Sequence, residues 1–431
     1  MASVSYPILP RLIYAALWLL AFPAVIGLLL FRSLAQPAYR RHLSERFAIY
    51  LPAPMAAPLW CHAASMGEVH ALKPLLLALR ADFPDMPVLI TCQTPAGRQA
   101  AQALKLAACT TVYLPMDLRW LTRRFLAHFR PRAALIVETE IWPNLFQATH
   151  RAGIPLMMVN ARMTERSLRR YNRFGGVFRA ALTIPEAILC QSAADASRFL
   201  AAGARVDTVS VTGNLKWDLA MDAETMASEL RRRAAWTQTP IWMAASTHPD
   251  EESAVLAAHG AVLAQWPTAL LIWAPRHPER FAAAVAAVEA QGLRVQRRSR
   301  QPEPSAQAQV FLVDTLGELR SFMPGMDLVF VGGSLQAIGG HNVLEPAAAG
   351  VPVLVGPHTA HFADSVAALS EAGGLLQVAD ANALVQQVTA LLADPARRQQ
   401  MAAASTSCVA ANRGALAKTK ARVAPCLGHP G

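Results

Sequence analysis

The sequence predicts two consecutive α/β domains of the doubly wound type, preceded by a single apolar helix. From about Pro58 onward, short apolar segments of strand-like composition alternate with helical patterns, which indicates mostly parallel sheets covered by helices on both faces. A polar stretch between Lys216 and Gln238 interrupts this alternation once, and the alternation then resumes. The chain has 431 residues, of which 53% are hydrophobic, so it is long enough to form two sizeable cores.

The apolar helix is predicted from Leu12 to Phe31, an uncharged run of twenty residues that is long enough to span a bilayer. The basic residues after this run outnumber the single Arg11 before it, and the positive-inside rule therefore leaves the rest of the chain in the cytoplasm. We expect residues 1–33 to form a membrane anchor. Two alternatives stay open, namely a cleaved signal peptide and a helix that lies partly in the membrane plane.

The first domain is expected at residues 34–222, where seven apolar segments indicate buried parallel strands. These segments are Leu59–Ala64, Val88–Cys92, Thr111–Leu114, Ala133–Val137, Leu156–Val159, Ala187–Cys190 and Thr208–Val211. Helical patterns such as Glu68–Ala81 and Ala194–Ala202 lie between them. Doubly wound sheets bind their ligands beside the carboxyl ends of the strands, so polar residues directly after strands are the candidates for function.

The second domain is expected at residues 223–431, and the polar stretch from Lys216 to Gln238 is interpreted as an interdomain connection. Five strands are predicted here, at Ile241–Ala244, Leu270–Trp273, Val310–Val313, Leu328–Val331 and Val353–Val355. Helical patterns cover Glu251–Gln265 and Glu279–Gln291, and a last long helical stretch begins near Ala381.

Acidic residues follow two strands of the first domain. Glu68 opens the helix after the first strand, where Gly67 would allow a ligand to approach the backbone closely. Glu68 is either a general base or a first-turn acid that complements the helix dipole, and the residue types alone do not separate these two roles. Glu138 and Glu140 follow the fourth strand, where acids are costly to desolvate, so a functional role is favoured over helix capping.

Lys216 follows the last strand of the first domain. Its ammonium group could stabilise the negative charge of a phosphate leaving group, although a surface lysine in a loop is an equally good interpretation.

Three segments that follow strands of the second domain could bind a nucleotide. They are Pro275-Arg276, Gly317-Glu318-Leu319 and Asn342-Val343-Leu344-Glu345. The arginine suits bidentate contact with a phosphate or carboxylate, and helix-start amides in the second segment could face a phosphate. The third segment follows two glycine pairs, and Glu345 could accept hydrogen bonds from ribose hydroxyls. The alternative for this segment is a set of glycine turns with a capping glutamate.

The composition narrows the classes of partner. The formal net charge of +11 suits a membrane surface, a nucleic acid or a phosphorylated substrate. Nucleic acid is disfavoured, because the sequence has no zinc-finger spacing and only 7% aromatic residues. The six cysteines are scattered without a C-x-x-C pair, and His277 and His341 have no partner at metal-ligand spacing, so we predict no metal site.

Together these segments resemble the Kdo (3-deoxy-D-manno-octulosonic acid) transferases of Gram-negative lipopolysaccharide synthesis. The resemblance covers nearly the whole chain, and its most specific segments are Glu138–Asn144 and Gly339–Asn342. Other matching segments are Ser65–Glu68, Asn160–Arg162, Gly213–Lys216, Ser246–His248, Pro275–Arg280 and Phe330–Leu335. The departures are mild, since Met66 stands where a valine is expected and Asn214 where a serine is common.

The resemblance implies a GT-B glycosyltransferase fold, in which two Rossmann-like domains face a cleft. It implies an inverting transfer of Kdo from CMP-Kdo to a lipid A precursor, lipid IVA, at the cell inner membrane. Glu68 would be the general base, and Glu138 and Lys216 match positions that stabilise the transition state. The three nucleotide segments match CMP-binding positions. The donor carries a single phosphate, so neither a metal nor a cofactor besides the substrate CMP-Kdo is expected.

The basic clusters of the first domain would then meet inner-membrane phospholipid and the phosphates of the acceptor. Two alternatives are kept. One is an enzyme of the same fold that uses a UDP-sugar, which competition by CMP against UMP would distinguish. The other is a non-catalytic, membrane-anchored binder of anionic lipids, which would keep its function after Glu68→Ala.

Overall fold

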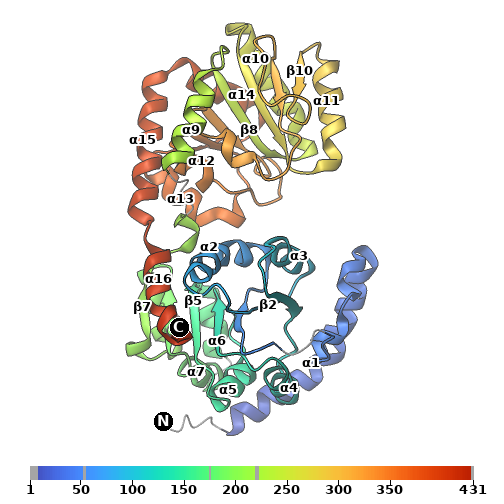
Figure 1. Ribbon diagram of the computed structural model, residues 1–431, viewed down its shortest axis with the longest axis vertical. Helices are drawn as coiled ribbons and strands as arrows, with labels where there is room; N and C mark the ends of the chain where they lie inside the picture. The colour runs from blue at the N-terminus through green and yellow to red at the C-terminus, as the bar shows by residue number, and fades with distance from the viewer. Residues whose placement is uncertain (1–7, 52–54, 174–175, 219–222, 429–431) are drawn as a thin grey trace. The chain divides into compact units, whose positions relative to one another are not determined.

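The computed structural model describes residues 8–51, 55–173, 176–218 and 223–428, and the chain forms two compact units (Figure 1). The N-terminal unit consists of Met1–Asp218 together with Arg413–Gly431, and the C-terminal unit consists of Leu219–Asn412. Each unit contains one seven-stranded sheet whose strand pairs are all parallel. Two doubly wound α/β domains are therefore confirmed.

The sheet of the N-terminal unit has the strand order β3-β2-β1-β4-β5-β6-β7. Its strands are β1 (Leu59–His62), β2 (Val88–Cys92), β3 (Cys109–Tyr113), β4 (Ala133–Val137), β5 (Leu156–Ala161), β6 (Ala187–Cys190) and β7 (Val209–Val211). All seven coincide with the predicted apolar segments apart from small shifts of their ends. The central strands β1, β2, β4, β5 and β6 are buried along their whole length, as expected of a sheet with helices on both faces.

Helices cover both faces of this sheet and create two apolar cores. They are α2 (Met66–Asp82), α3 (Pro95–Ala103), α4 (Arg119–Phe129), α5 (Pro143–Arg151), α6 (Glu165–Arg173), α7 (Gly176–Leu182) and α8 (Ala193–Ala202). One core contains residues of α4, α5 and α7, whereas the other contains residues of α2. The long apolar helix α1 (Ile8–Ala35) lies beside the first core, against which Trp18 and Phe22 pack (Figure 1).

The C-terminal unit repeats the architecture with the strand order β10-β11-β9-β8-β12-β13-β14. Its strands are β8 (Ile241–Thr247), β9 (Leu270–Pro275), β10 (Val295–Arg297), β11 (Val310–Leu312), β12 (Leu328–Val331), β13 (Val353–Val355) and β14 (Leu375–Gln377). The two edge strands β10 and β14 were not predicted. Each has only three residues, and each includes polar side chains, so neither forms an apolar run.

The helices of the C-terminal unit include one in a stretch that the sequence analysis treated as a connection. They are α9 (Ala223–Ala234), α10 (Glu252–Gln265), α11 (Phe281–Ala290), α12 (Leu344–Ala348), α13 (Ala363–Glu371), α14 (Ala381–Ala393) and α15 (Pro395–Asn412). The polar residues of α9 bind to its own unit, since Arg232 donates to the carbonyl of Ser321 at 3.0 Å and Arg233 to that of Gly325 at 3.1 Å. This segment is therefore a surface helix rather than a linker.

The end of the chain differs from the expected domain bounds, because α16 (Ala415–Val423) belongs to the N-terminal unit. Val423 and Leu427 are buried in the core beside α2. The carboxylate of Asp218 accepts hydrogen bonds from the backbone of Gly414 at 2.8 Å and of Leu416 at 2.7 Å. Residues 413–428, which were predicted to belong to the second domain, thus complete the first one.

Replacing Leu427 by alanine tests this assignment. Leu427 is 4% exposed, and its truncation leaves a cavity in the N-terminal core. We expect Leu427→Ala to reduce the free energy of unfolding of this unit by about 2–3 kcal/mol. Chemical denaturation followed by tryptophan fluorescence measures the change. Leu200→Ala, at a residue that is 37% exposed, is the control and should cost much less; equal effects of the two substitutions would contradict the placement.

Candidate functional site

The centre of the N-terminal sheet is a topological switch point. From β1 the chain proceeds outward through β2 and β3 on one side, and it then crosses to β4, which pairs with β1 on the other side. Ligands of doubly wound sheets bind where the strand order reverses in this way. Glu68 follows β1, and Glu138 and Glu140 follow β4, so the candidate acids stand at this point.

Glu68 is fixed in the first turn of α2 by a reciprocal cap. Ser65 is the N-cap residue, and its hydroxyl accepts from the backbone nitrogen of Glu68 at 3.4 Å. In return, the carboxylate of Glu68 accepts from the backbone of Ala64 at 2.7 Å and from the Ser65 hydroxyl at 2.9 Å. Glu68 therefore lies in the first turn, as the sequence suggests, and its capping contacts hold the carboxylate at the edge of the sheet.

Burial, together with the negative charges of Glu140 and Glu138, raises the pKa of Glu68 to about 7. The carboxylate of Glu140 has a different environment. Its Oε2 accepts from the indole of Trp142 at 2.9 Å and lies 3.5 Å from Nε2 of His62. Burial opposes ionisation of Glu140, but the contact with His62 and the hydrogen bond from Trp142 outweigh it and leave its pKa below the usual range. Neighbouring carboxyl groups with separated pKa values are the arrangement that acid–base chemistry requires.

His62 is a part of the site that the sequence analysis did not identify. It is the last residue of β1 and is fully buried. Its Nδ1 lies 2.9 Å from the hydroxyl of Thr91 on β2, so that Nε2 faces Glu140. A histidine inside an apolar strand carries no local signal of function, because its partner is far away in the sequence.

Glu138 and Lys216 lie together, although their strands are not neighbours. Nζ of Lys216 is 3.5 Å from Oε1 of Glu138. Lys216 reaches this position because the loop after β7 turns back over the sheet, where the backbone of Leu215 donates to Oδ1 of Asn160 at 2.9 Å. Glu138 has a φ of +58°, in the left-handed region that is costly for a residue with a side chain. The surrounding contacts hold a strained turn at the candidate site.

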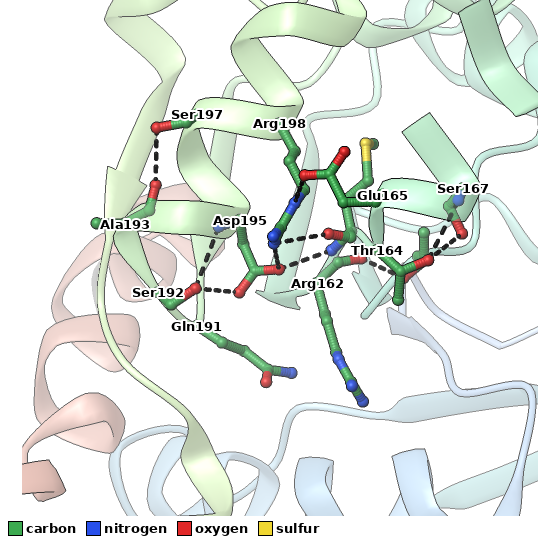
Figure 2. A network of polar contacts seen from close by, with 12 residues as sticks. Arg162, Thr164, Glu165, Ser167, Gln191, Ser192, Ala193, Asp195, Ser197 and Arg198 are labelled. Atoms are coloured by element: carbon green, nitrogen blue, oxygen red, sulfur yellow. Dashed lines mark hydrogen bonds and ion pairs between the residues drawn. The ribbon is translucent and has the colours of Figure 1, made fainter. Parts of the chain in front are cut away.

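Thr139 anchors the turn between the two acids. Its hydroxyl donates to the carbonyl of Arg162, and its own carbonyl accepts from the hydroxyl of Tyr171 at 3.2 Å. The loop that contains Arg162 is fastened in turn to α8, as Figure 2 shows. There Asp195 accepts from the backbone of Met163 at 2.9 Å, and Arg198 donates to Glu165 at 2.7 Å. This network therefore stabilises the turn that contains Glu138 and Glu140.

The C-terminal unit has a second switch point, between β8 and β12. The loop after β12 is organised there by Glu251, a fully buried residue that the sequence analysis placed only in a helix. Its carboxylate accepts four backbone hydrogen bonds, from His248 at 3.0 Å, Gly333 at 2.7 Å, Ser334 at 3.0 Å and Leu335 at 2.9 Å. A Cβ atom on Gly332 would lie 2.7 Å from this carboxylate, which explains the glycine.

Arg276 and the segment Asn342–Glu345 both follow strands of this unit. Pro275 is buried at the end of β9, and the exposed Arg276 is held through its backbone, which donates to the carbonyl of Thr247 at 3.0 Å. The side-chain oxygen of Asn342 accepts from the backbone of Leu344, the first residue of α12, at 3.1 Å. Val343 and Leu344 are buried, and Glu345 lies in the first turn of α12.

The segment Gly317–Leu319 differs from the expected helix start. Gly317 has a φ of +87°, and Leu319 begins a 3₁₀ helix, Leu319–Phe322. The carboxylate of Glu318 is engaged by Arg298 at 2.7 and 3.1 Å, and this ion pair, together with the hydroxyl of Thr315, lowers its pKa to about 2. Its side chain is therefore occupied by contacts within the protein.

A cavity of about 300 Å³ lies between α4 and α5. Three arginines, Arg119, Arg123 and Arg151, line it together with Asn144, the last residue of the segment Glu138–Asn144. The carboxylate cluster, which consists of Glu68, Glu138 and Glu140, does not line this cavity. The arginines of the lining favour an anionic group.

Comparison with known proteins identifies relatives of the whole chain. Residues 41–219 match the family model of 3-deoxy-D-manno-octulosonic-acid transferase (kdotransferase). The chain is 35% identical over 421 residues to the 3-deoxy-D-manno-octulosonic acid transferase of Haemophilus influenzae, covering 97% of this chain and 99% of that one. It is 40% identical over 389 residues to the enzyme of the same name from Bordetella pertussis, covering 88% and 89%.

Among solved structures, the chain is similar to MurG of Acinetobacter baumannii. The TM-score is 0.54 at 13% identity, and the match covers 86% of this chain and 100% of that one. At this identity the similarity shows the fold alone, which is the GT-B arrangement of two Rossmann-like domains.

The ionisation of Glu68 gives a direct test of the carboxylate cluster. We expect a carboxyl group that titrates near pH 7 in the infrared difference between the protein and Glu68→Gln. Glu140→Gln removes a neighbouring negative charge and should therefore lower the pKa of Glu68. The exposed Glu279→Gln is the control and should leave it unchanged. Titration of Glu68 near pH 4 would contradict both its burial and its position beside the other acids.

Proposed function

This chain belongs to the Kdo transferase family of glycosyltransferases, and we propose that it transfers Kdo from CMP-Kdo to a lipid A precursor with Glu68 as the general base. The observation that carries the assignment of the base is the pKa of Glu68, about 7, at the switch point of the N-terminal sheet. A base with a pKa near the working pH is both ionised in part and strong enough to accept a proton.

The proposed reaction is a single displacement. The acceptor hydroxyl gives its proton to the Glu68 carboxylate while its oxygen forms a bond to the anomeric carbon of the donor. The bond from that carbon to the phosphate oxygen of CMP breaks in the same step, and CMP leaves with the electron pair. Attack opposite to the leaving group inverts the configuration of the anomeric carbon.

Glu138 and Lys216 are proposed to stabilise the transition state. The strained backbone of Glu138 and the loop that carries Lys216 are both held by buried contacts, so the charges are positioned before the reaction. Lys216 would counter the negative charge that develops on the leaving phosphate. The carboxylate of Glu138, whose Oε1 lies 3.5 Å from Nζ of Lys216, would keep the ammonium group of Lys216 oriented.

The donor is proposed to bind to the loops of the C-terminal unit. The exposed guanidinium of Arg276 offers paired donors for a phosphate or a carboxylate. The backbone of Gly317–Leu319 and the segment Asn342–Glu345 would complete the CMP site. CMP carries one phosphate, so no metal is needed to bridge a diphosphate, and we propose that the transfer needs neither a metal nor a further cofactor.

The acceptor is proposed to be lipid IVA at the cytoplasmic face of the inner membrane. Its phosphates match the arginine-lined cavity between α4 and α5 in charge. The helix from Leu12 to Leu34 is long and apolar enough to associate with a membrane, which suits an enzyme whose acceptor is a lipid.

Measuring Kdo transfer by the Glu68→Gln variant tests whether Glu68 is the general base. The variant should lose between about a hundredfold and ten-thousandfold in kcat, because the amide cannot accept the proton. Mass spectrometry of lipid IVA incubated with CMP-Kdo in EDTA measures the gain of Kdo, and binding of CMP should be retained. In the unaltered protein, kcat/KM should rise with pH through about 7, since the ionised form of Glu68 is active.

Glu289→Gln serves as the matched control for this experiment, because Glu289 is an exposed acid of α11 in the other unit. Full activity of Glu68→Gln would remove Glu68 as the base. Competition by UMP instead of CMP would exclude the cytidine donor, and a requirement for added metal would contradict the metal-independent reaction.

Charge reversal in the arginine-lined cavity tests the acceptor site. Arg123→Glu should raise the KM for lipid IVA about tenfold, the loss expected for one charge-assisted hydrogen bond. The KM for CMP-Kdo should not change. Arg397→Glu makes the same change of charge at an exposed position of α15 and should leave both constants as they are. An unaltered acceptor KM in Arg123→Glu would exclude this cavity.

A further inference from the structure

Helix α1 is docked on the N-terminal unit along most of its length. One side of the helix is partly buried against the core that contains α4, α5 and α7. The residues on this side are Tyr14, Trp18, Phe22, Val25, Ile26 and Leu29. Their spacing of three and four residues places them on a single face of the helix. Ser33, four residues further on, is buried.

The docked face makes specific contacts at the start of α5. The hydroxyl of Tyr14 donates to Oδ2 of Asp117 at 2.8 Å. Asp117 is 2% exposed, and its carboxylate also accepts from the backbone of Asn144 at 3.0 Å and of Leu145 at 2.8 Å. These two nitrogens belong to the first turn of α5, so Asp117 caps α5 and binds α1 with the same carboxylate.

Aromatic rings extend the docking along the helix. The rings of Trp18 and Trp142 are 6.4 Å apart between centroids, and Phe22 meets Phe47 edge to face at 5.9 Å. Trp142 also donates to Glu140 of the carboxylate cluster at 2.9 Å. The inner face of α1 therefore contacts the segment that bears the candidate acids.

The outer face of α1 is apolar and exposed. Its large exposed side chains are Leu12, Ile13, Leu17, Leu19, Leu20, Leu28, Leu30, Phe31 and Leu34. No charged residue occurs between Leu12 and Phe31. A helix that is apolar all round must be covered on every side, and here the protein covers one side only.

The docked length conflicts with a helix that crosses the membrane. The contacts run from Tyr14 to Leu29, which corresponds to about 22 Å of helix at 1.5 Å per residue. A bilayer core is about 30 Å thick, so a crossing helix would have to leave the domain over nearly all of this length. Leaving would uncover the inner face and would deprive the buried Asp117 of the Tyr14 hydroxyl.

We propose that α1 lies in the plane of one leaflet, with its inner face on the N-terminal unit and its outer face in lipid. The occupant of the outer face is an anionic bilayer. Arg32, Arg40 and Arg41 are exposed at the C-terminal end of the helix and just beyond it, where they match anionic headgroups. This inference rests on the proposed membrane association and does not depend on the transfer reaction. It places the carboxylate cluster at a fixed position beside the membrane surface.

The side of the membrane on which the N-terminus lies tests the proposal. The full chain would carry one epitope tag at its N-terminus and another at its C-terminus, each behind a protease site. Protease is then added to inverted inner-membrane vesicles, whose cytoplasmic face is outside. An in-plane helix leaves both tags accessible, so both should be removed without detergent. An N-terminal tag that is protected until detergent is added would overturn the proposal, whereas loss of the C-terminal tag verifies access.

Cysteine cross-linking in the same membranes tests the docked face. The pair Trp18→Cys and Trp142→Cys should be joined by a short bifunctional maleimide. The pair Leu20→Cys and Trp142→Cys is the matched control and should not react, because Leu20 is on the outer face and 78% exposed. Absence of the first cross-link would overturn the docking. Dimers formed through Leu20→Cys alone would show that a second copy, rather than lipid, covers the outer face. None of these assays needs a donor or an acceptor, so failed transfer and a failed topology are distinguished.

Discussion

The cost of burying carboxylates at the carboxyl edges of central strands governs both units of this protein. In the C-terminal unit, Glu251 accepts four backbone hydrogen bonds and is thereby fully compensated, which makes it a structural support of the glycine loop. In the N-terminal unit, Glu68 accepts only one backbone hydrogen bond and one from a hydroxyl. Burial disfavours the charge of Glu68, two nearby carboxylates disfavour it further, and its pKa therefore rises. A buried glutamate that follows a central strand thus has a structural role in one unit, as Glu251, and is the candidate base in the other, as Glu68.

The sequence predicts those features that are local in the chain. Apolar runs identify the strands, and the acids that follow β1 and β4 can be read as candidates because all carboxyl ends of a parallel sheet meet at one edge. Partners that are distant in the sequence cannot be read in this way. Glu251 acts on a backbone 82 residues away, and Lys216 meets Glu138 across 78 residues. His62 and Asp117 look like ordinary strand and loop residues until the sheet brings their partners to them.

The domain bounds show the same limit. A helical pattern at the end of the chain gives no sign of the unit on which it packs, and α16 returns to the first core through Asp218, which binds Gly414 at a separation of 196 residues. The short edge strands β10 and β14 are also invisible to pattern, because an edge strand need not be apolar. In both cases tertiary contacts, rather than local composition, determine the structure.

The composition of α1 correctly predicts an apolar helix, but it does not decide whether this helix crosses the membrane. Its length and hydropathy satisfy the requirements for a membrane span, yet these quantities measure only that the helix avoids water. Two apolar media are available to it, the protein core on one side and lipid on the other. The single phenolic hydroxyl of Tyr14 distinguishes them, because it needs a partner when buried and finds one in Asp117. Since Asp117 also caps α5, which directly follows the acidic turn, docking of α1 and the geometry of that turn depend on one carboxylate.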